Sequence, residues 1–297
     1  MARAVAARRG ALWPALCLGF NALVWGVSWW PFRQLQAQGL HPLWATVLIY
    51  AVAVVVLVAA RPAALGVLLR TPALWVLVLA SGTTNAAFNW AMVIGDVVRV
   101  VLLFYLMPLW AVLLARWLLD ESFSRAALLR VALSLAGAAI VLWPADGGWP
   151  LPRTLADALG IVGGFSFALN NVMLRREAAR PEEARALAMF AGGVLVAGAL
   201  ATLLGYRGEV PWPPALAPGW ALATLALAIA FLASNFALQF GAARLAANVT
   251  AVVLLTEVVF AAGSALALGG GRLTPQLVLG GILIIGAAAL AALCPAA

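Results

Sequence analysis

The chain contains no lysine and carries little charge of either sign. Only 9% of its 297 residues are charged, 66% are hydrophobic, and the mean hydropathy is +1.06. A soluble domain cannot bury that much apolar surface, so the composition indicates a polytopic membrane protein. The absence of lysine also excludes a phosphate-binding loop of the G-x-x-x-x-G-K-[ST] type, because that motif requires one.

Histidine and cysteine are almost absent as well. His41 is the single histidine, and Cys17 and Cys294 are the two cysteines. One histidine does not exclude a Ser–His–Asp set or a metal site, but no other group clusters with it. Both cysteines lie in apolar segments, as expected of small packed residues. We therefore expect no cofactor, no metal and no enzyme activity.

Ten apolar stretches are long enough to cross a bilayer. None alternates with a period of two, as a barrel strand would. The sequence therefore predicts an all-α integral membrane protein with ten transmembrane helices. The expected spans cover residues 11–30, 43–60, 72–92, 97–118, 126–143, 155–174, 184–204, 215–240, 246–268 and 274–294.

The arginines predict how these helices are oriented. All 18 basic residues are arginines, and with the N-terminus inside, 13 of them fall in inner loops or at inner helix ends. The outer ones are Arg33, Arg99, Arg153, Arg207 and Arg272. This bias follows the positive-inside rule and places both termini in the cytoplasm, with the chain in the inner membrane. The net charge of +8 thus reflects topology and not a nucleic-acid partner.

The two halves of the chain resemble each other. The segment Asn89–Gly95 reads NWAMVIG and the segment Asn235–Gly241 reads NFALQFG. Three further pairs occur in the same order, namely Trp75 and Trp220, Gly19 and Gly164, and Gly137 and Gly286. Five helices per copy is an odd number, so the second copy must enter the membrane from the opposite side. We expect inverted repeats over residues 1–145 and 146–297, which suit alternating access to a site near the midplane.

Polar and aromatic side chains form stripes on one face of the first and third helix of each repeat. The stripes consist of Asn21, Trp25 and Trp29; Ser81, Asn85 and Asn89, followed by Trp90; Ser166, Asn170 and Asn171; and Asn235 and Gln239. Converging stripes would form a cavity of amides, hydroxyls and tryptophans with almost no formal charge, suited to an amphiphilic solute. Alternatively, each amide bonds a neighbouring helix, and the tryptophans pack against lipid or protein.

Three residues are candidates for coupling or gating. Glu257 is the one carboxylate in the middle of a long apolar run, residues 246–268, where an ionised group costs about 2.5–3.5 kcal/mol or more. It is either a proton-linked or solute-contacting group, or a protonated side chain bonded to a neighbouring backbone. Pro108 should kink the fourth span. Arg99 either forms a surface ion pair with Asp96 or steers a carboxylate-bearing solute.

Several stretches resemble the EamA-type transporters of the drug/metabolite transporter superfamily. They are LVWGVSWW (23–30), YLMPLWAVLLARWLLDE (105–121) and LLTEVVFAAGSALALGGGRLTPQLVLGG (254–281). The Trp25-Gly26 pair, Pro108 and Glu121 match positions that are typical of the family. The resemblance covers all ten expected helices, and it implies a secondary transporter. Because one ten-helix chain holds both halves, it requires no partner subunit, and we expect a monomer in the bilayer.

The ninth span departs from the family pattern. Glu257 matches the acidic residue of a Glu-Pro pair, but Val258 replaces the proline, and Gly270-Gly271 replaces an acidic residue that closes the helix. Within the family, a tryptophan-rich neutral cavity looks most like the aromatic amino-acid exporters, which implies a small-molecule substrate such as an aromatic or other neutral amino acid. Export of drugs or other metabolites, lipid scrambling and an intramembrane enzyme are the alternatives.

Overall fold

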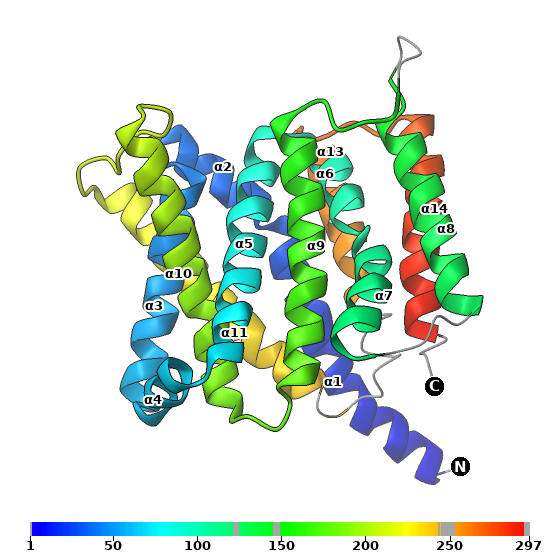
Figure 1. The fold of residues 1–297 in the computed structure, drawn as a ribbon, viewed down its shortest axis with the longest axis horizontal. Helices are drawn as coiled ribbons and strands as arrows, with labels where there is room; N and C mark the ends of the chain where they lie inside the picture. The colour runs from blue at the N-terminus through cyan, green and yellow to red at the C-terminus, as the bar shows by residue number, and fades with distance from the viewer. Residues whose placement is uncertain (1, 121–124, 145–148, 243, 245–252, 294–297) are drawn as a thin grey trace.

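A computed structural model describes residues 2–120, 125–144, 149–242, 244 and 253–293, and every regular element among them is a helix (Figure 1). The helices of the first half are α1 (Ala2–Val27), α2 (Trp29–Ala37), α3 (Pro42–Ala60), α4 (Ala63–Arg70), α5 (Pro72–Ile94), α6 (Val97–Phe104), α7 (Met107–Leu118) and α8 (Arg125–Leu142). Those of the second half are α9 (Leu155–Arg176), α10 (Glu182–Tyr206), α11 (Pro218–Ala242), α13 (Thr256–Leu268) and α14 (Pro275–Leu293). The beginning of α1 and the end of α14 lie at the same end of the bundle (Figure 1).

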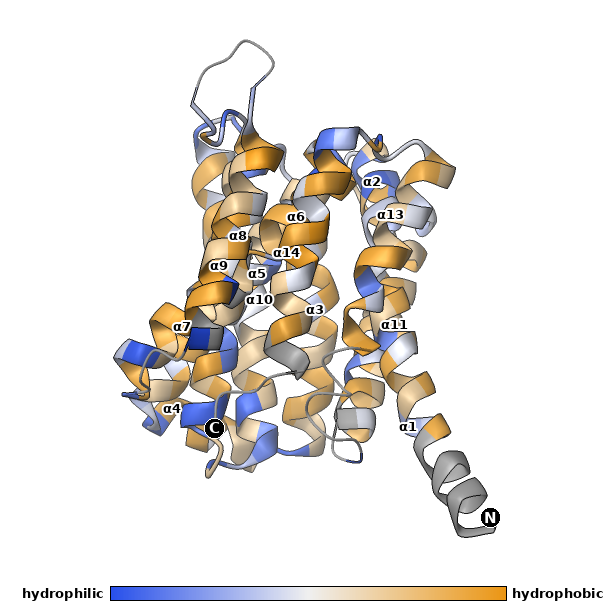
Figure 2. Ribbon diagram, turned by 90° about the vertical axis from the view of Figure 1, so that its right-hand side faces the viewer, coloured by the Kyte–Doolittle hydropathy of each residue, from blue (hydrophilic) through white to orange (hydrophobic). Residues whose placement is uncertain are grey.

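The helices have the length and polarity of membrane spans. Seven stretches of the described chain are long and apolar enough to cross a bilayer, counting α1 with α2 and α6 with α7 as one each. Shorter apolar helices lie at the fifth, ninth and tenth expected positions. Large apolar side chains such as Val55, Val259 and Ile282 face outward, and hydrophilic residues gather toward the two ends of the bundle (Figure 2). The chain is therefore an all-helical, multi-pass membrane protein.

The fourth expected span is not one continuous helix. α6 ends at Phe104 and α7 begins at Met107, with Pro108 in the first turn of α7. A proline lacks the N–H that continues a helix, and its ring clashes with the preceding turn, so the helix is interrupted just before it. Tyr105, at the interruption, is 3% exposed. The break therefore lies inside the bundle and directs side chains toward its middle.

Small residues allow close approach between helices. A Cβ on Gly82 of α5 would overlap the backbone of Gly192 on α10, so these helices touch main chain to main chain. At the contact of α8 with α14, a Cβ on Gly137 would lie 2.7 Å from the carbonyl oxygen of Gly280. Gly286, which the sequence comparison paired with Gly137, has open space at that position. Close packing of this kind holds helices together in lipid, where the burial of apolar surface provides little driving force for helix association.

The largest contacts between helices are related by an exchange of the two halves, whereas smaller ones, such as that of α3 with α5, have no counterpart of similar extent among the described residues. The exchange pairs α1 with α9, α3 with α10, α5 with α11, α6 and α7 with α13, and α8 with α14. Under it, the contact of α5 with α9 becomes that of α11 with α1, and the contact of α5 with α10 becomes that of α11 with α3. The packing of α6 and α7 on α9 becomes that of α13 on α1. Two copies of one five-helix unit would pack in this way.

Candidate functional site

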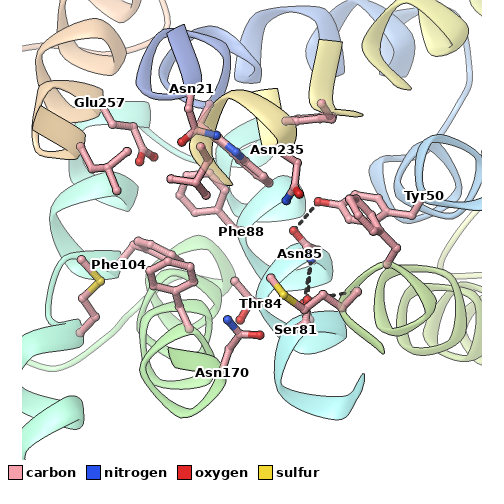
Figure 3. Close-up of a pocket in the computed structure, with 18 of the residues that line it drawn as sticks. Asn21, Tyr50, Ser81, Thr84, Asn85, Phe88, Phe104, Asn170, Asn235 and Glu257 are labelled. Atoms are coloured by element: carbon pink, nitrogen blue, oxygen red, sulfur yellow. Dashed lines mark hydrogen bonds between the residues drawn. The ribbon is translucent and has the colours of Figure 1, made fainter. Parts of the chain in front are cut away.

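A cavity of about 200 Å³ lies between helices of both halves (Figure 3). Its wall takes side chains from α1, α3, α5, α9, α10 and α11, from the end of α6 and the beginning of α7, and from the beginning of α13. The sequence-predicted residues that the structure brings together here are Asn21, Trp25, Ser81, Asn85, Asn170, Asn235 and Glu257. All four polar stripes therefore contribute at least one residue to one cavity.

Two amides of the wall are held by hydrogen bonds between or within helices. Asn21 of α1 donates through Nδ2 to the carbonyl oxygen and the Oγ of Ser234 on α11, at 3.1 and 2.7 Å. Asn85 of α5 accepts at Oδ1 from the hydroxyl of Tyr50 on α3, at 2.6 Å. Its Nδ2 donates back to the carbonyl oxygen of Ser81, at 2.8 Å. These amides are thus fixed in orientation, as a binding wall requires.

Asn170 differs from the other amides because its acceptor atom is not used. The residue is 2% exposed, and its Nδ2 lies 3.4 Å from the Oδ1 of Asn171. Its Oδ1 has no hydrogen-bond partner within the described part of the chain. A buried polar atom without a partner is costly, so such an atom on a cavity wall points to a ligand or a water that completes it.

Glu257 lies in the first turn of α13 and directs its carboxylate into the cavity (Figure 3). Its Oε2 accepts a hydrogen bond from the hydroxyl of Tyr105, at 3.3 Å. The sequence left open a bond from this side chain to a neighbouring backbone, whereas the partner is a phenol at the break between α6 and α7. The main chain at Glu257 also packs closely on Gly26 of α1, because a Cβ on Gly26 would lie 2.8 Å from the Glu257 carbonyl oxygen.

The aromatic part of the wall is a row of neighbouring rings. The ring centroids of Phe231 and Trp25 lie 4.6 Å apart, and those of Trp25 and Phe88 lie 6.5 Å apart. Phe104 follows at 4.7 Å from Phe88, and Phe167 at 5.4 Å from Phe104. The sequence predicted a tryptophan-rich lining, but Trp25 is the one tryptophan among the lining residues that the structure describes. The wall is therefore rich in phenylalanine.

Two residues of the predicted stripes make contacts between helices away from the cavity. Trp29 is 1% exposed, and its Nε1 donates to the Oγ of Ser264 on α13, at 2.9 Å. Asn89 donates through Nδ2 to the Oγ1 of Thr46 on α3, at 3.0 Å. Both side chains therefore bond a neighbouring helix, which is the alternative to a place in the cavity wall.

The remaining predicted residues of the stripes also lie apart from the lining set. Trp90 packs edge-on against the ring of His41, with centroids 5.2 Å apart, and Asn171 is exposed. The side chain of Gln239 and the whole of Glu121 lie outside the described residues.

Sequence reasoning missed part of the wall. Tyr50 and Tyr105 line the cavity, and they are two of only three tyrosines in the chain. A hydroxyl group within an apolar run is itself a signal, and it could have identified both residues. The phenylalanines carried no such signal, because an aromatic residue in a membrane helix packs against protein or lipid as readily as it lines a cavity.

Arg99 lies near the end of the bundle opposite the termini. Its Nε and Nη2 contact the carboxylate of Asp157 on α9 at 2.6 and 3.1 Å, and its Nη1 donates to the carbonyl oxygen of Val141 on α8, at 2.7 Å. The carboxylate of Asp96 instead accepts the backbone N–H groups of Arg99 and Arg272, each at 2.9 Å. The guanidinium thus pairs with Asp157 in place of the expected Asp96, and it ties α6, α8 and α9 together.

Comparison with known proteins agrees with this architecture. No curated protein matches the chain. A solved crystal structure, described only as that of a protein, is similar over 94% of this chain and 96% of its own, with a TM-score of 0.57 and 23% sequence identity. That likeness shows the fold alone. Residues 12–143 match the EamA-like transporter family. This match supports the resemblance of the chain to EamA-type transporters of the drug/metabolite transporter superfamily, which are membrane transporters of small solutes.

Proposed function

We propose that this protein is a secondary transporter that moves small amphiphilic solutes by alternating access. The observation that carries the proposal is a cavity between the two halves, whose wall combines fixed amides, one carboxylate and a row of aromatic rings. Aromatic and other neutral amino acids are the class that the resemblance to amino-acid exporters favours. The rings match an aromatic side chain, and the Glu257 carboxylate matches the ammonium group of such a solute.

Alternating access requires two units that move against each other around a fixed site. We assign these units to residues 1–145 and 146–297, as inverted repeats of five transmembrane helices. The exchange symmetry of the helix contacts supports this assignment. So do the two matched segments, because Gly95 packs closely against α9 and Gly241 packs closely against α1, which are equivalent helices under the exchange.

The proposed location is the inner membrane of the cell, with both termini in the cytoplasm. The arginine distribution supports this orientation. It agrees with the position of the beginning of α1 and the end of α14 at one end of the bundle. Under this orientation, the ion pair of Arg99 and Asp157 faces the outside. We propose that it holds that side closed, and that the break before Pro108 is where α6 and α7 change their relative angle.

Uptake of labelled phenylalanine into liposomes that contain the purified protein tests the proposal. We expect saturable uptake that excess tryptophan or tyrosine suppresses, and none in protein-free liposomes. Asn85→Leu and Asn235→Leu should abolish uptake because both amides line the cavity, while Gln36→Leu, at an exposed amide outside the lining set, should leave it unchanged. A lipid scramblase would retain its activity in all three variants. Absence of uptake by a folded, inserted protein would refute the amino-acid class.

A second experiment tests the proposed role of Glu257 in coupling. If its carboxylate carries a proton, Glu257→Gln should abolish the acceleration of uptake by a pH gradient while phenylalanine exchange continues at equal pH. Glu183→Gln is the matched control, because Glu183 lies at an exposed helix end and pairs loosely with Arg61 at 3.7 Å. A normal response of Glu257→Gln to the gradient would exclude Glu257 as the proton carrier.

A further inference from the structure

The hydroxyl groups on the cavity wall are already committed as donors. Tyr50 donates to Asn85 Oδ1 at 2.6 Å, and Tyr105 donates to Glu257 Oε2 at 3.3 Å. Thr84 donates to the carbonyl oxygen of Ala80 within its own helix, at 2.8 Å. A solute that needs hydrogen-bond donors, as a carboxylate does, would have to displace these bonds.

The amides of the wall also have most of their donor groups already bonded to protein acceptors. The Nδ2 groups of Asn21 and Asn85 each have two protein acceptors within 3.3 Å. The Oδ1 of Asn170 has no partner in the described part of the chain, although the residue is 2% exposed. Among the hydroxyls and amides named here, the unused polar atom is therefore an acceptor, the Oδ1 of Asn170.

The formal charge of the wall also favours a cationic solute over an anionic one. Among the described residues that line the cavity, Glu257 is the one acidic residue, and none is an arginine or a histidine. A solute carboxylate would thus meet a like charge and no counter-ion, which disfavours it in a poorly solvated space. An ammonium group would meet the Glu257 carboxylate and the faces of nearby aromatic rings, both of which attract a cation.

We infer that the cavity selects aromatic amines, which carry an ammonium group and no carboxylate, over the corresponding amino acids. The ammonium lies against Glu257, and the ring of the solute lies among Trp25, Phe88 and Phe104. The inference rests on the proposed role of the cavity as the solute site. It narrows the amphiphilic solutes proposed above to those with a positive head group.

A ligand series on the purified protein tests this without any substitution. Equilibrium binding of labelled phenethylamine in detergent is competed with unlabelled phenethylamine, phenylalanine and 3-phenylpropionate, which share a ring and differ in charge. We expect 3-phenylpropionate to bind at least about 30-fold more weakly than phenethylamine, with phenylalanine in between. Equal or tighter binding of phenylalanine or 3-phenylpropionate would overturn the inference.

Two variants test whether the ammonium group of the solute binds at Glu257. Glu257→Gln should weaken phenethylamine binding about 30-fold and leave the affinity for neutral 2-phenylethanol unchanged. Glu183→Gln should change neither affinity, because its side chain is 46% exposed and lies outside the lining set. Unchanged binding of phenethylamine to Glu257→Gln would overturn the assignment of the ammonium site.

The outcomes separate this inference from the proposed function. Tight binding of phenethylamine without any uptake of it into liposomes would uphold the amine site and refute the transporter. Saturable uptake of phenylalanine with no preference for phenethylamine in binding would refute the amine site and uphold the transporter.

Discussion

The ion pair of Arg99 and Asp157 should be a measurable source of stability, which is unusual for a pair near the end of a bundle. The Asp157 side chain is 2% exposed and the Arg99 side chain 30% exposed. Two guanidinium nitrogens contact the two carboxylate oxygens at 2.6 and 3.1 Å, and a third bonds the Val141 carbonyl oxygen. The geometry is therefore bidentate, which is the arrangement in which an arginine pair is strongest.

The size of the effect follows from what each substitution leaves behind. Removal of one partner of a fully buried pair costs about 3–5 kcal/mol, because the other charge stays buried without compensation. The guanidinium here is partly in contact with solvent, which reduces that cost by screening. We expect Arg99→Met to destabilise the protein by about 2 kcal/mol, and the double-mutant cycle with Asp157→Asn to give a coupling of about 1–2 kcal/mol.

Reversible unfolding in mixed micelles, followed by tryptophan fluorescence, measures all four proteins of the cycle. The chain provides its own control in Arg61 and Glu183, which lie 3.7 Å apart with side chains 67% and 46% exposed. That exposed pair should show a coupling below about 0.5 kcal/mol. If the coupling of Arg99 and Asp157 is equally small, burial and bidentate geometry do not give this pair the role that we assign to it.

Four other substitutions have clear expected outcomes in thermal unfolding. Gly137→Ala should cost about 1–3 kcal/mol because its Cβ would meet the backbone of α14, whereas Gly286→Ala, in open space, should stabilise by about 0.5–1 kcal/mol. Tyr50→Phe should cost about 1–3 kcal/mol because Asn85 Oδ1 loses its 2.6 Å donor, and unchanged stability would show that water replaces the hydroxyl. Burial lowers the pKa of His41, in the loop before α3, from 6.5 to about 4. Because the folded state resists protonation of this ring, the contribution of His41 to the free energy of unfolding is fully present above about pH 6.5 and falls as the pH drops from about 6.5 to 4. His41→Asn, which keeps a cap acceptor, should lose this part of the pH dependence of the melting temperature.

The sequence predicted the positions of the helices well because lipid imposes one simple requirement. Every backbone group in the bilayer must be bonded within its own segment, so long apolar runs become helices regardless of their neighbours. A described helix overlaps each of the ten expected stretches, although residues 246–252 of the ninth lie outside the described residues, and the helix break falls at Pro108 as its chemistry demands. The equivalence of Gly137 and Gly286 in the two repeats stays a prediction, because it concerns matching sequence positions and not a contact. In space, Gly137 lies against Gly280.

The candidate site was predictable in its polar members and much less so in its apolar ones. Asn21, Asn85 and Asn170 stood out because an amide within an apolar run needs a partner. Helical periodicity then placed Asn89 on the same face as Asn85, although only Asn85 reaches the cavity. One turn along a helix changes the depth in the membrane, and the depth at which a cavity opens depends on how neighbouring helices cross. A single sequence does not contain that information.

The position of the cavity follows from two helix beginnings in the interior of the bundle. α7 begins at Met107, and α13 begins at Thr256 after a turn at Leu255 that follows the helical residues 253–254. These two helices correspond under the exchange of the two halves. Tyr105 and Glu257, which bond each other, come from these two places. A helix beginning leaves backbone groups without partners in the helix, and inside a membrane protein such groups are tolerated where they border a cavity. Proline explains the first of these beginnings, but valine stands at position 258 in the second. The position at which α13 begins therefore depends on packing. The contact that can fix it is that of α1 with α13, where Gly26 lies directly against the main chain of Glu257.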